Sequence, residues 1–267
     1  MSKQQQILFV SHGGGPMPLM GDPGHQEMVK RLHEIRKQLK KPDAILLISA
    51  HWEEQVATVT TGSTPELIYD YYGFPPETYS IKYPAPGHPQ LAEKVMQSLQ
   101  AAGLPVRGDA RRGFDHGMFV PLKILFPEAD IPVVQLSLVH SLNPDVHLAI
   151  GEALQGLEFE NLLVLGSGFS FHNMRAFFAP NTRELQARNE AFESWLLETC
   201  SSDRLSETER KERFSGWEKA PEARFCHPRE EHLLPLHVCY GMAGKAVDKH
   251  WSAVVLNKKS GMFYWQV

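Results

Sequence analysis

Short apolar runs alternate along the chain with longer segments in which apolar residues recur at helical spacing. Runs such as Ile7–Val10 and Leu162–Leu165 are apolar throughout, which is typical of strands buried on both faces of a sheet. The pattern predicts strands at Ile7–Val10, Ala44–Ser49, Val56–Thr60, Ile131–Leu138, Leu162–Leu165, Ser252–Leu256 and Phe263–Trp265. It predicts helices at Pro23–Leu39, Gln90–Ala102, Phe119–Leu125, Pro144–Leu154, Thr182–Thr199, Arg204–Trp217 (charged, on the surface) and Pro228–Met242.

This alternation of strands and helices predicts an α/β fold with a central, mostly parallel mixed sheet flanked by helices. The last two strands are expected as antiparallel additions at the edge. No change in composition marks a boundary, so residues 1–267 are interpreted as a single domain. A long loop rich in tyrosine, proline and glycine spans Tyr69–Pro86, and loops of this length inside a compact domain are often functional.

Composition and charge exclude several classes of function. Hydrophobic residues make up 42% and charged residues 22% of the chain, with a formal net charge of -4, as in ordinary globular proteins. No basic block suggests a nucleic-acid partner, and no apolar run is long enough to span a membrane. Three cysteines without a CxxC pair argue against a disulfide framework or a thiolate metal site. With no signal peptide apparent, we expect a cytoplasmic protein.

Histidines follow three of the predicted strands and are the main chemical signal in the sequence. His12 comes directly after Ile7–Val10 and Ser11, His51 follows Ala44–Ser49, and His172 lies shortly after Leu162–Leu165. Parallel strands in an open α/β sheet end at one common edge, where ligands bind. Because imidazole is the commonest metal-binding side chain, this arrangement predicts a metal site at that edge.

Two further histidines have neighbours that suggest a role. His116 follows Asp115, whose carboxylate could orient the ring, and His232 follows Glu231 in the first turn of the predicted helix Pro228–Met242. For His25, His33, His140, His147, His227, His237 and His250 the sequence suggests only solvated or hydrogen-bonded histidines, and His88 is expected at a helix start. The triple glycine after His12 permits close backbone approach, but without a GxGxxG or GK[ST] motif it does not indicate phosphate binding.

Nitrogen and oxygen ligands without thiolate suit Zn²⁺ or Fe²⁺. His12 and His51 would supply two nitrogens, and either Glu231 or His232 would supply the third ligand. Spacing alone leaves open a zinc-dependent hydrolase and a non-heme iron oxygenase. A non-catalytic binding protein with a decayed metal site is a third alternative, but every one of the motif histidines is present.

Several ordered motifs resemble the class III extradiol ring-cleavage dioxygenases, and in particular the DOPA 4,5-dioxygenase subfamily. The similarity extends from His12 to about Gly244; one departure is Gly13-Gly14-Gly15-Pro16, where the family commonly has Gly-Ser-Pro. The motifs are His12–Met17, Ser49–Trp52, Tyr72–Pro75, Tyr83–Gly87, Gly113–Gly117, Val134–Ser137 and Glu231–Leu236.

The resemblance implies a mononuclear metal site with His12, His51 and His232 as ligands. It implies that His172 is either a further ligand or the acid/base beside the metal, and that His116 lies near the substrate. The implied reaction opens the ring of a DOPA-like catechol with O₂, with Fe²⁺ as the active metal and Zn²⁺ as an alternative occupant. We expect His172 to transfer the protons and His116 to donate a hydrogen bond. Tyr71, Tyr72 and Phe74 would either wall the ring site or pack in the core.

Overall fold

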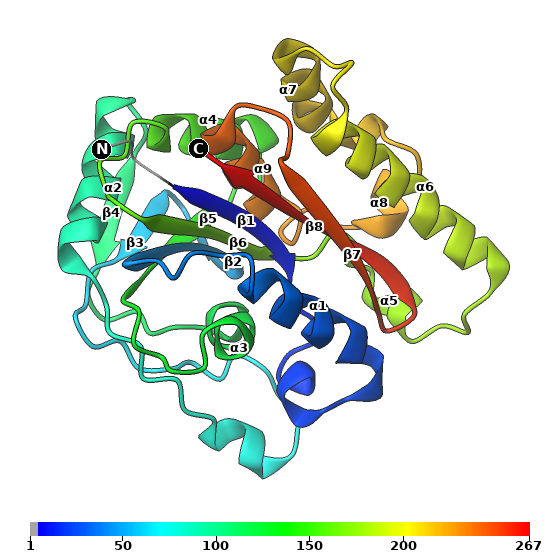
Figure 1. The fold of residues 1–267 in the computed structure, drawn as a ribbon, viewed down its shortest axis with the longest axis horizontal. Helices are drawn as coiled ribbons and strands as arrows, with labels where there is room; N and C mark the ends of the chain where they lie inside the picture. Colours follow the sequence, from blue (N-terminus) through cyan, green and yellow to red (C-terminus); the bar gives the residue numbers. More distant parts are fainter. Residues whose placement is uncertain (1–4) are drawn as a thin grey trace.

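The structure, a computed structural model, describes residues 5–267 and contains one eight-stranded mixed sheet. Strand order is β4-β3-β5-β2-β6-β1-β8-β7 (Figure 1). The central strands β5, β2, β6 and β1 are mutually parallel, so their carboxyl ends lie along one edge, as predicted. The strands are β1 (Gln6–Ser11), β2 (Ala44–Glu54), β3 (Ala57–Thr60), β4 (Val106–Asp109), β5 (Val133–Val139), β6 (Leu162–Gly168), β7 (Lys249–Val255) and β8 (Lys258–Gln266).

Antiparallel strands extend the parallel centre on both sides. β8 pairs antiparallel with β1 and with β7, which confirms the expected edge addition at the end of the chain. On the other side β3 pairs antiparallel with β5 through Val59 and Leu136, and β4 lies parallel to β3. β4 is absent from the predicted strands because its residues, Val-Arg-Gly-Asp, have neither an apolar run nor a clear alternation.

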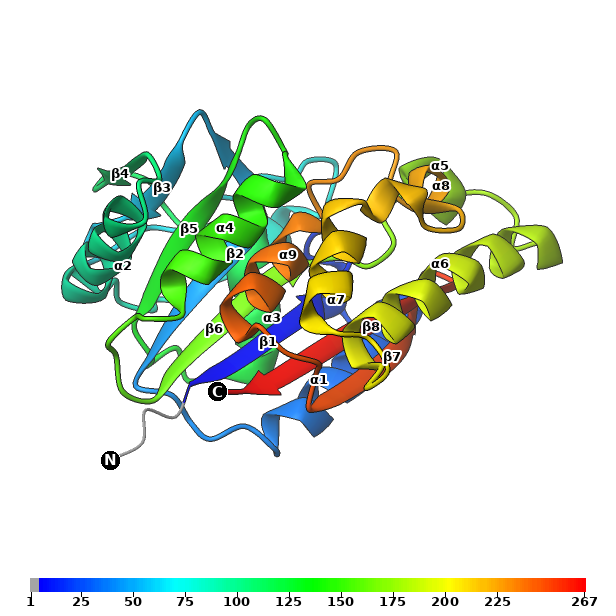
Figure 2. The same ribbon diagram turned by 90° about the horizontal axis from the view of Figure 1, so that it is seen from above.

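Helices cover both faces of the sheet. α4 and α9 pack together on one face, and α1 and α3 pack on the other (Figure 1). Viewed from above, α6 lies along β8, with α7 beside it (Figure 2). The helices are α1 (Gln26–Arg36), α2 (Pro89–Ala101), α3 (His116–Leu125), α4 (Pro144–Leu154), α5 (Met174–Phe177), α6 (Arg183–Ser201), α7 (Glu207–Ser215), α8 (Ala223–Cys226) and α9 (Leu234–Ala243), with 3-10 turns η1 (Met17–Met20), η2 (Pro23–His25), η3 (Pro76–Ser80) and η4 (Trp217–Lys219). Within residues 5–267, no helix combines the length and apolarity that crossing a membrane requires.

One predicted helix boundary is wrong in a way that matters for the site. The segment 228–242 was expected to be helical throughout, but α9 begins only at Leu234, with Pro235 in its first turn. Proline lacks a backbone N–H and has a preset φ, so it suits the start of a helix better than its interior. His232 therefore lies in the turn before α9 and not on a helix.

The charged segment 204–217 contains α7, which lies on the surface and packs one face against the protein. Ser206 and Glu209 form a capping box at its start. On its inner face Arg210 and Phe214 are buried, and the guanidinium of Arg210 donates to the carbonyl oxygens of Thr199 and, at 2.8 Å, Ser202. α7 is therefore a surface helix, as predicted, and its buried arginine is stable because backbone acceptors satisfy its donors.

Candidate metal centre

His12 continues the line of β1 at the carboxyl edge of the sheet. Its backbone N–H donates to the carbonyl of Gly168, the last residue of β6, at 3.0 Å. His51, by contrast, lies inside β2, in an irregular stretch where the register with β5 shifts between Ile48 and Glu53. The prediction that His51 lies just beyond its strand is wrong in that detail. An irregular strand redirects side chains, and here it brings His51 to the same edge as His12.

The tautomer of His12 is fixed by Ser167, at the end of β6. Ser167 Oγ donates its proton to the carbonyl of Gly117 and lies 3.0 Å from His12 Nδ1. A hydroxyl has only one proton to donate, so Nδ1 of His12 is the donor in the second contact. The Nε2 nitrogen of His12 therefore carries an unshared electron pair.

That Nε2 atom lies 3.0 Å from Nε2 of His51. Two nitrogens that each lie ~2.1 Å from one ion, at an angle of roughly 90°, are also about 3.0 Å apart. The donors at this point are imidazole nitrogens without a thiolate, which suits Zn²⁺ or Fe²⁺. The spacing and the chemistry of this pair both fit a shared divalent ion.

Glu231 orients two rings at once. Its Oε1 atom lies 2.9 Å from Nδ1 of His232 and 3.2 Å from Nδ1 of His172. The two rings stack with centroids 3.4 Å apart, and each keeps Nε2 as its free nitrogen. Burial alone would raise the pKa of Glu231, but hydrogen bonds from His172 and His232 outweigh it and lower that pKa, so the carboxylate stays charged.

His116 opens α3 and is oriented by Asp70. Both its backbone N–H and its Nδ1 lie 2.9 Å from Oδ1 of Asp70. The expectation that Asp115 orients this ring is wrong. Asp115 instead accepts hydrogen bonds from Ser49 Oγ at 2.7 Å and from the side-chain amide of Gln135, and burial raises its pKa.

The structure brings all five singled-out histidines together at one cavity. Ring centroids lie 4.9 Å apart for His12 and His51, 4.9 Å for His51 and His232, and 5.3 Å for His12 and His232. Donor atoms within 4.8 Å of one another form two groups, His12 with His51 and His116, and His172 with Glu231 and His232. His116 thus lies as near to the first pair as a ligand would, although the family resemblance places it beside the substrate.

Burial keeps the central imidazoles neutral. Desolvation, followed by repulsion from neighbouring imidazolium charge, lowers the pKa of His12 and His51 well below the usual value. Desolvation and the neighbouring His172 lower the pKa of His232 to about 3, against the opposing pull of Glu231. Neutral imidazole is the form that binds metals, so these rings are ready for an ion near neutral pH.

A cavity of about 500 Å³ opens beside the histidines. Tyr71, Tyr72 and Phe74, from the long loop after β3, line it together with Phe169. Tyr71 both lines the cavity and packs in the core, so both of the roles predicted for this loop apply to it. Its hydroxyl donates to the carbonyl of Thr78 at 2.7 Å. Tyr72 is exposed and contributes only to the cavity.

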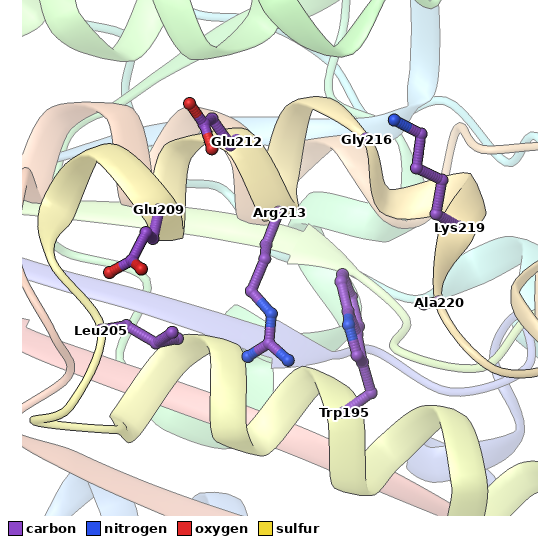
Figure 3. A pocket seen from close by; sticks show the side chains of 8 residues that line it. All are labelled: Trp195, Leu205, Glu209, Glu212, Arg213, Gly216, Lys219 and Ala220. Carbon is purple, nitrogen blue, oxygen red and sulfur yellow. The ribbon is translucent and has the colours of Figure 1, made fainter.

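A second hollow, between α6 and α7, has a different character. Arg213 lies over the ring of Trp195 there, with Glu209 and Lys219 nearby (Figure 3). No histidine or cysteine is among the side chains that line it. Its mixed surface charges contrast with the imidazoles at the sheet edge, which are oriented by hydrogen bonds to Ser167, Glu231 and Asp70.

Asp70 and Ser167 belong to the site but are not among the residues that the sequence singles out. Asp70 is the only acidic residue in the aromatic segment 69–76, which is a signal that could have been noticed. Ser167 follows the apolar run Leu162–Leu165 between two glycines, and nothing in the sequence around it signals that it orients His12.

Fold and site together define an α/β protein with a histidine-rich candidate metal centre at the carboxyl edge of its sheet. Comparison with known families narrows this class. Residues 6–265 match the family described as the catalytic LigB subunit of aromatic ring-opening dioxygenase.

Relatives agree with that match. The chain is 42% identical to "Dioxygenase tasH" of Hapsidospora irregularis, covering 92% of this chain and 80% of the relative. It is 38% identical to "4,5-DOPA dioxygenase extradiol" of Beta vulgaris, covering 97% and 96%. An uncharacterized protein from Escherichia coli K12, known from a crystal structure, superposes with a TM-score of 0.74 at 25% identity, covering 99% of this chain and 100% of that one.

The chain belongs to the LigB family of aromatic ring-opening dioxygenases. It is an extradiol ring-cleaving dioxygenase, and the zinc-dependent hydrolase finds no support in these comparisons. Members of this family depend on a metal, and the cluster of histidines provides the candidate site in this chain.

Proposed function

We propose that this enzyme opens the ring of a catechol beside its two hydroxyl groups, with Fe²⁺ held by His12, His51 and His232. The main observation that supports this proposal is the 3.0 Å distance between the Nε2 atoms of His12 and His51. The other ring nitrogen of His12, Nδ1, is hydrogen-bonded to Ser167. DOPA, named for several relatives, is the first catechol to test. The whole of 1–267 would act as one catalytic domain, and its three free cysteines are consistent with a reducing cytoplasm.

A ferrous ion at this position would supply Lewis acidity and the one-electron chemistry that dioxygen requires. The overall change balances without another reductant, because both atoms of O₂ appear in the ring-opened semialdehyde. Zn²⁺ could occupy the same nitrogens but would not support reaction with oxygen. The protein groups contribute binding, orientation and proton transfer.

We assign proton transfer to His172. Its Nδ1 is hydrogen-bonded to the Glu231 carboxylate at 3.2 Å, and the ring lines the cavity. The carboxylate stabilises the protonated ring, so Nε2 can accept a catechol proton and later return it. The alternative role for His172 is that of a fourth metal ligand, because its ring stacks directly on that of His232.

We assign substrate orientation to His116. Asp70 accepts from its Nδ1, which leaves Nε2 free to contact a ligand in the cavity. Burial alone would raise the pKa of Asp70, but the hydrogen bonds from His116 outweigh it and lower that pKa, so the carboxylate remains charged. A charged carboxylate holds the ring in one orientation.

The test is reconstitution without oxygen, followed by addition of O₂ and a catechol. The Fe²⁺ enzyme should consume one O₂ per catechol, form a yellow semialdehyde and carry both labelled atoms from ¹⁸O₂ into the product. Zn²⁺-loaded and metal-free protein are the controls. Absence of oxygen uptake with every catechol, in protein shown to contain iron, would refute the proposal.

His172→Ala separates the two roles of that residue. As acid/base, its loss should leave iron content close to wild type and lower kcat by at least ~100-fold. Loss of iron together with activity would instead identify His172 as a ligand. Normal turnover would show that neither assignment holds.

A further inference from the structure

The cavity wall away from the histidines is apolar. Its lining there consists of Met17, Tyr72, Met174, Phe177, Phe178 and Leu256. Asp70 is the only aspartate, glutamate, lysine or arginine among the residues that line the cavity, and it lies beside the histidines, where Oδ1 accepts from His116 and Oδ2 lies 3.9 Å from Nδ1 of His51. A charged group on a ligand would therefore find no ion-pair partner on this wall.

Exposed apolar side chains gather at the mouth of the same cavity. Seven large apolar side chains are exposed in the part of the chain that the structure describes, and Tyr72, Met174 and Phe178 are three of them. Apolar side chains that cluster at one concave place, rather than being scattered over the surface, indicate a binding surface. The mouth therefore suits an apolar group that extends outward from the ring site.

The short helix α5 connects this mouth to the catalytic imidazoles. Phe177 packs on Phe169 with ring centroids 5.4 Å apart and lies 6.5 Å from His172. Asn173 anchors the helix, because its side chain accepts from the Ala176 N–H at 3.1 Å and donates to the Phe225 carbonyl at 2.7 Å. The apolar wall is thus a fixed continuation of the ring site.

Leu256 reaches this wall from the tip of the β7–β8 hairpin. It forms a two-residue turn with Asn257, and both have positive φ, 47° and 65°. Such turns favour asparagine and glycine, so leucine is unfavourable at the first position. Its backbone N–H donates to the Gly24 carbonyl at 2.9 Å, which fixes the tip against the cavity. A residue with a strained backbone whose side chain lines a cavity suggests that the side chain has a binding role that offsets the strain.

We propose that the substrate is a catechol with an uncharged, apolar substituent, and that Leu256 and Met174 contact this substituent. The inference rests on the proposed ring-opening function. Burial of an alkyl or aryl group against this wall gains hydrophobic free energy, whereas an amino-acid side chain would bring charges without partners. The enzyme would accordingly prefer an apolar catechol to DOPA.

Matched catechols test the preference directly. We expect kcat/KM for 4-butylcatechol to exceed that for DOPA by at least ~10-fold, with 4-methylcatechol between them. Calorimetric titration of the Zn²⁺-loaded protein gives the same comparison as dissociation constants, without turnover. A DOPA value equal to or better than that of 4-butylcatechol would overturn the inference and leave the ring-opening function intact. If no catechol is opened at all, the proposed function itself fails.

Leu256→Gly tests the residue. Glycine adopts positive φ without strain, which offsets the packing that the partly buried Leu256 side chain loses, so this variant should fold. It should lower the ratio of kcat/KM for 4-butylcatechol to that for unsubstituted catechol by about five-fold. An unchanged ratio would refute the assignment of Leu256. Val254→Ala, an exposed position on the same hairpin outside the cavity, is the matched control.

Met174→Arg and Arg175→Ala test charge at the mouth. Met174→Arg should raise binding of 3,4-dihydroxyphenylpropionate by about ten-fold and weaken 4-butylcatechol, because it supplies the missing cation. Arg175 is exposed on α5 and is not among the lining residues, so Arg175→Ala should not alter selectivity. If Arg175→Ala weakens carboxylate-bearing catechols selectively, the wall already recognises charge and the inference is wrong.

Discussion

The carbonyl oxygen of His232 lies where a side chain on Gly168 would be. A Cβ atom at residue 168 would approach that oxygen to 2.1 Å, and the next residue, Phe169, donates its N–H to the same oxygen at 2.9 Å. The absence of a side chain at the end of β6 therefore lets the turn before α9 approach the sheet. It is this approach that brings the His232 ring to His12.

Gly168→Ala should displace His232 from the site. The methyl group meets rigid backbone, so we expect a loss of about 1–3 kcal/mol in unfolding free energy and at least ~10-fold weaker metal binding. Thermal unfolding and metal content after dialysis measure the two effects. Gly156→Ala, where nothing lies within 4 Å of an added Cβ, is the control. Full metal content in Gly168→Ala would contradict this account of how His232 is positioned.

Ser167→Ala should affect the metal through the tautomer of His12. Without the hydroxyl, Nδ1 of His12 loses its acceptor, and the ring no longer favours the form with a free Nε2. We expect metal affinity to fall about 10- to 100-fold while the fold is retained. Competition with a metal-binding dye measures the affinity, and Ser63→Ala, at an exposed position, serves as the control. An unaltered affinity would show that Ser167 does not determine the tautomer.

Asp70→Asn should impair turnover more than metal binding. The neutral amide holds the His116 ring less firmly, so we expect kcat to fall about 10- to 100-fold. Iron content, measured on the same sample, should remain near that of the wild type if His116 contacts substrate. A parallel loss of iron would instead place His116 among the ligands, in keeping with its proximity to His12 and His51.

Acid should destabilise the fold through histidines outside the site. His147 is buried, donates from Nδ1 to the Asn143 carbonyl at 2.7 Å and accepts at Nε2 from the Val139 N–H at 3.1 Å. Burial lowers its pKa to about 4, and burial likewise lowers the pKa of His237 to about 4.

These histidines have lower pKa values in the folded than in the unfolded state, so between roughly pH 6.5 and 4 the unfolded chain binds more protons. Stability therefore rises with pH across that window. Each histidine should contribute about 1 kcal/mol of lost stability between pH 6.5 and 5.5. Urea unfolding at several pH values measures this, and His147→Gln should reduce the slope. An identical slope in that variant would contradict the assignment.

Residues that depend on strand order could be predicted from the sequence, and those that depend on loop paths could not. His12 and His172 follow apolar runs, and parallel strands bring such positions to one edge. Asp70 orients His116 across 46 residues of chain, and nothing in the local sequence specifies that path. Asp115 precedes His116 but lies before the first turn of α3, where its side chain bonds to Ser49 and Gln135 instead.

The predicted boundaries of the helix that contains His237 and of the strand before His51 differ from the structure for related reasons. The segment before Leu234 has helix-compatible residues, but the backbone there is held by the Phe169–His232 hydrogen bond, which is a tertiary contact. The irregular stretch of β2 at His51 likewise reflects a register shift against β5 that a single strand does not reveal. In both places long-range contacts override local preference, and in both places a histidine of the site is involved.

The order β2-β6-β1 at the centre of the sheet has a consequence for assembly of the protein. The proposed ligands come from the residue after β1, from β2 and from the turn before α9, so they lie far apart in the sequence and meet only in the folded chain. The three proposed ligands come together only after β6 has inserted between its two neighbours and α9 has docked. For the proposed ligand set, we therefore expect loading with metal to be a late event that follows completion of the native topology.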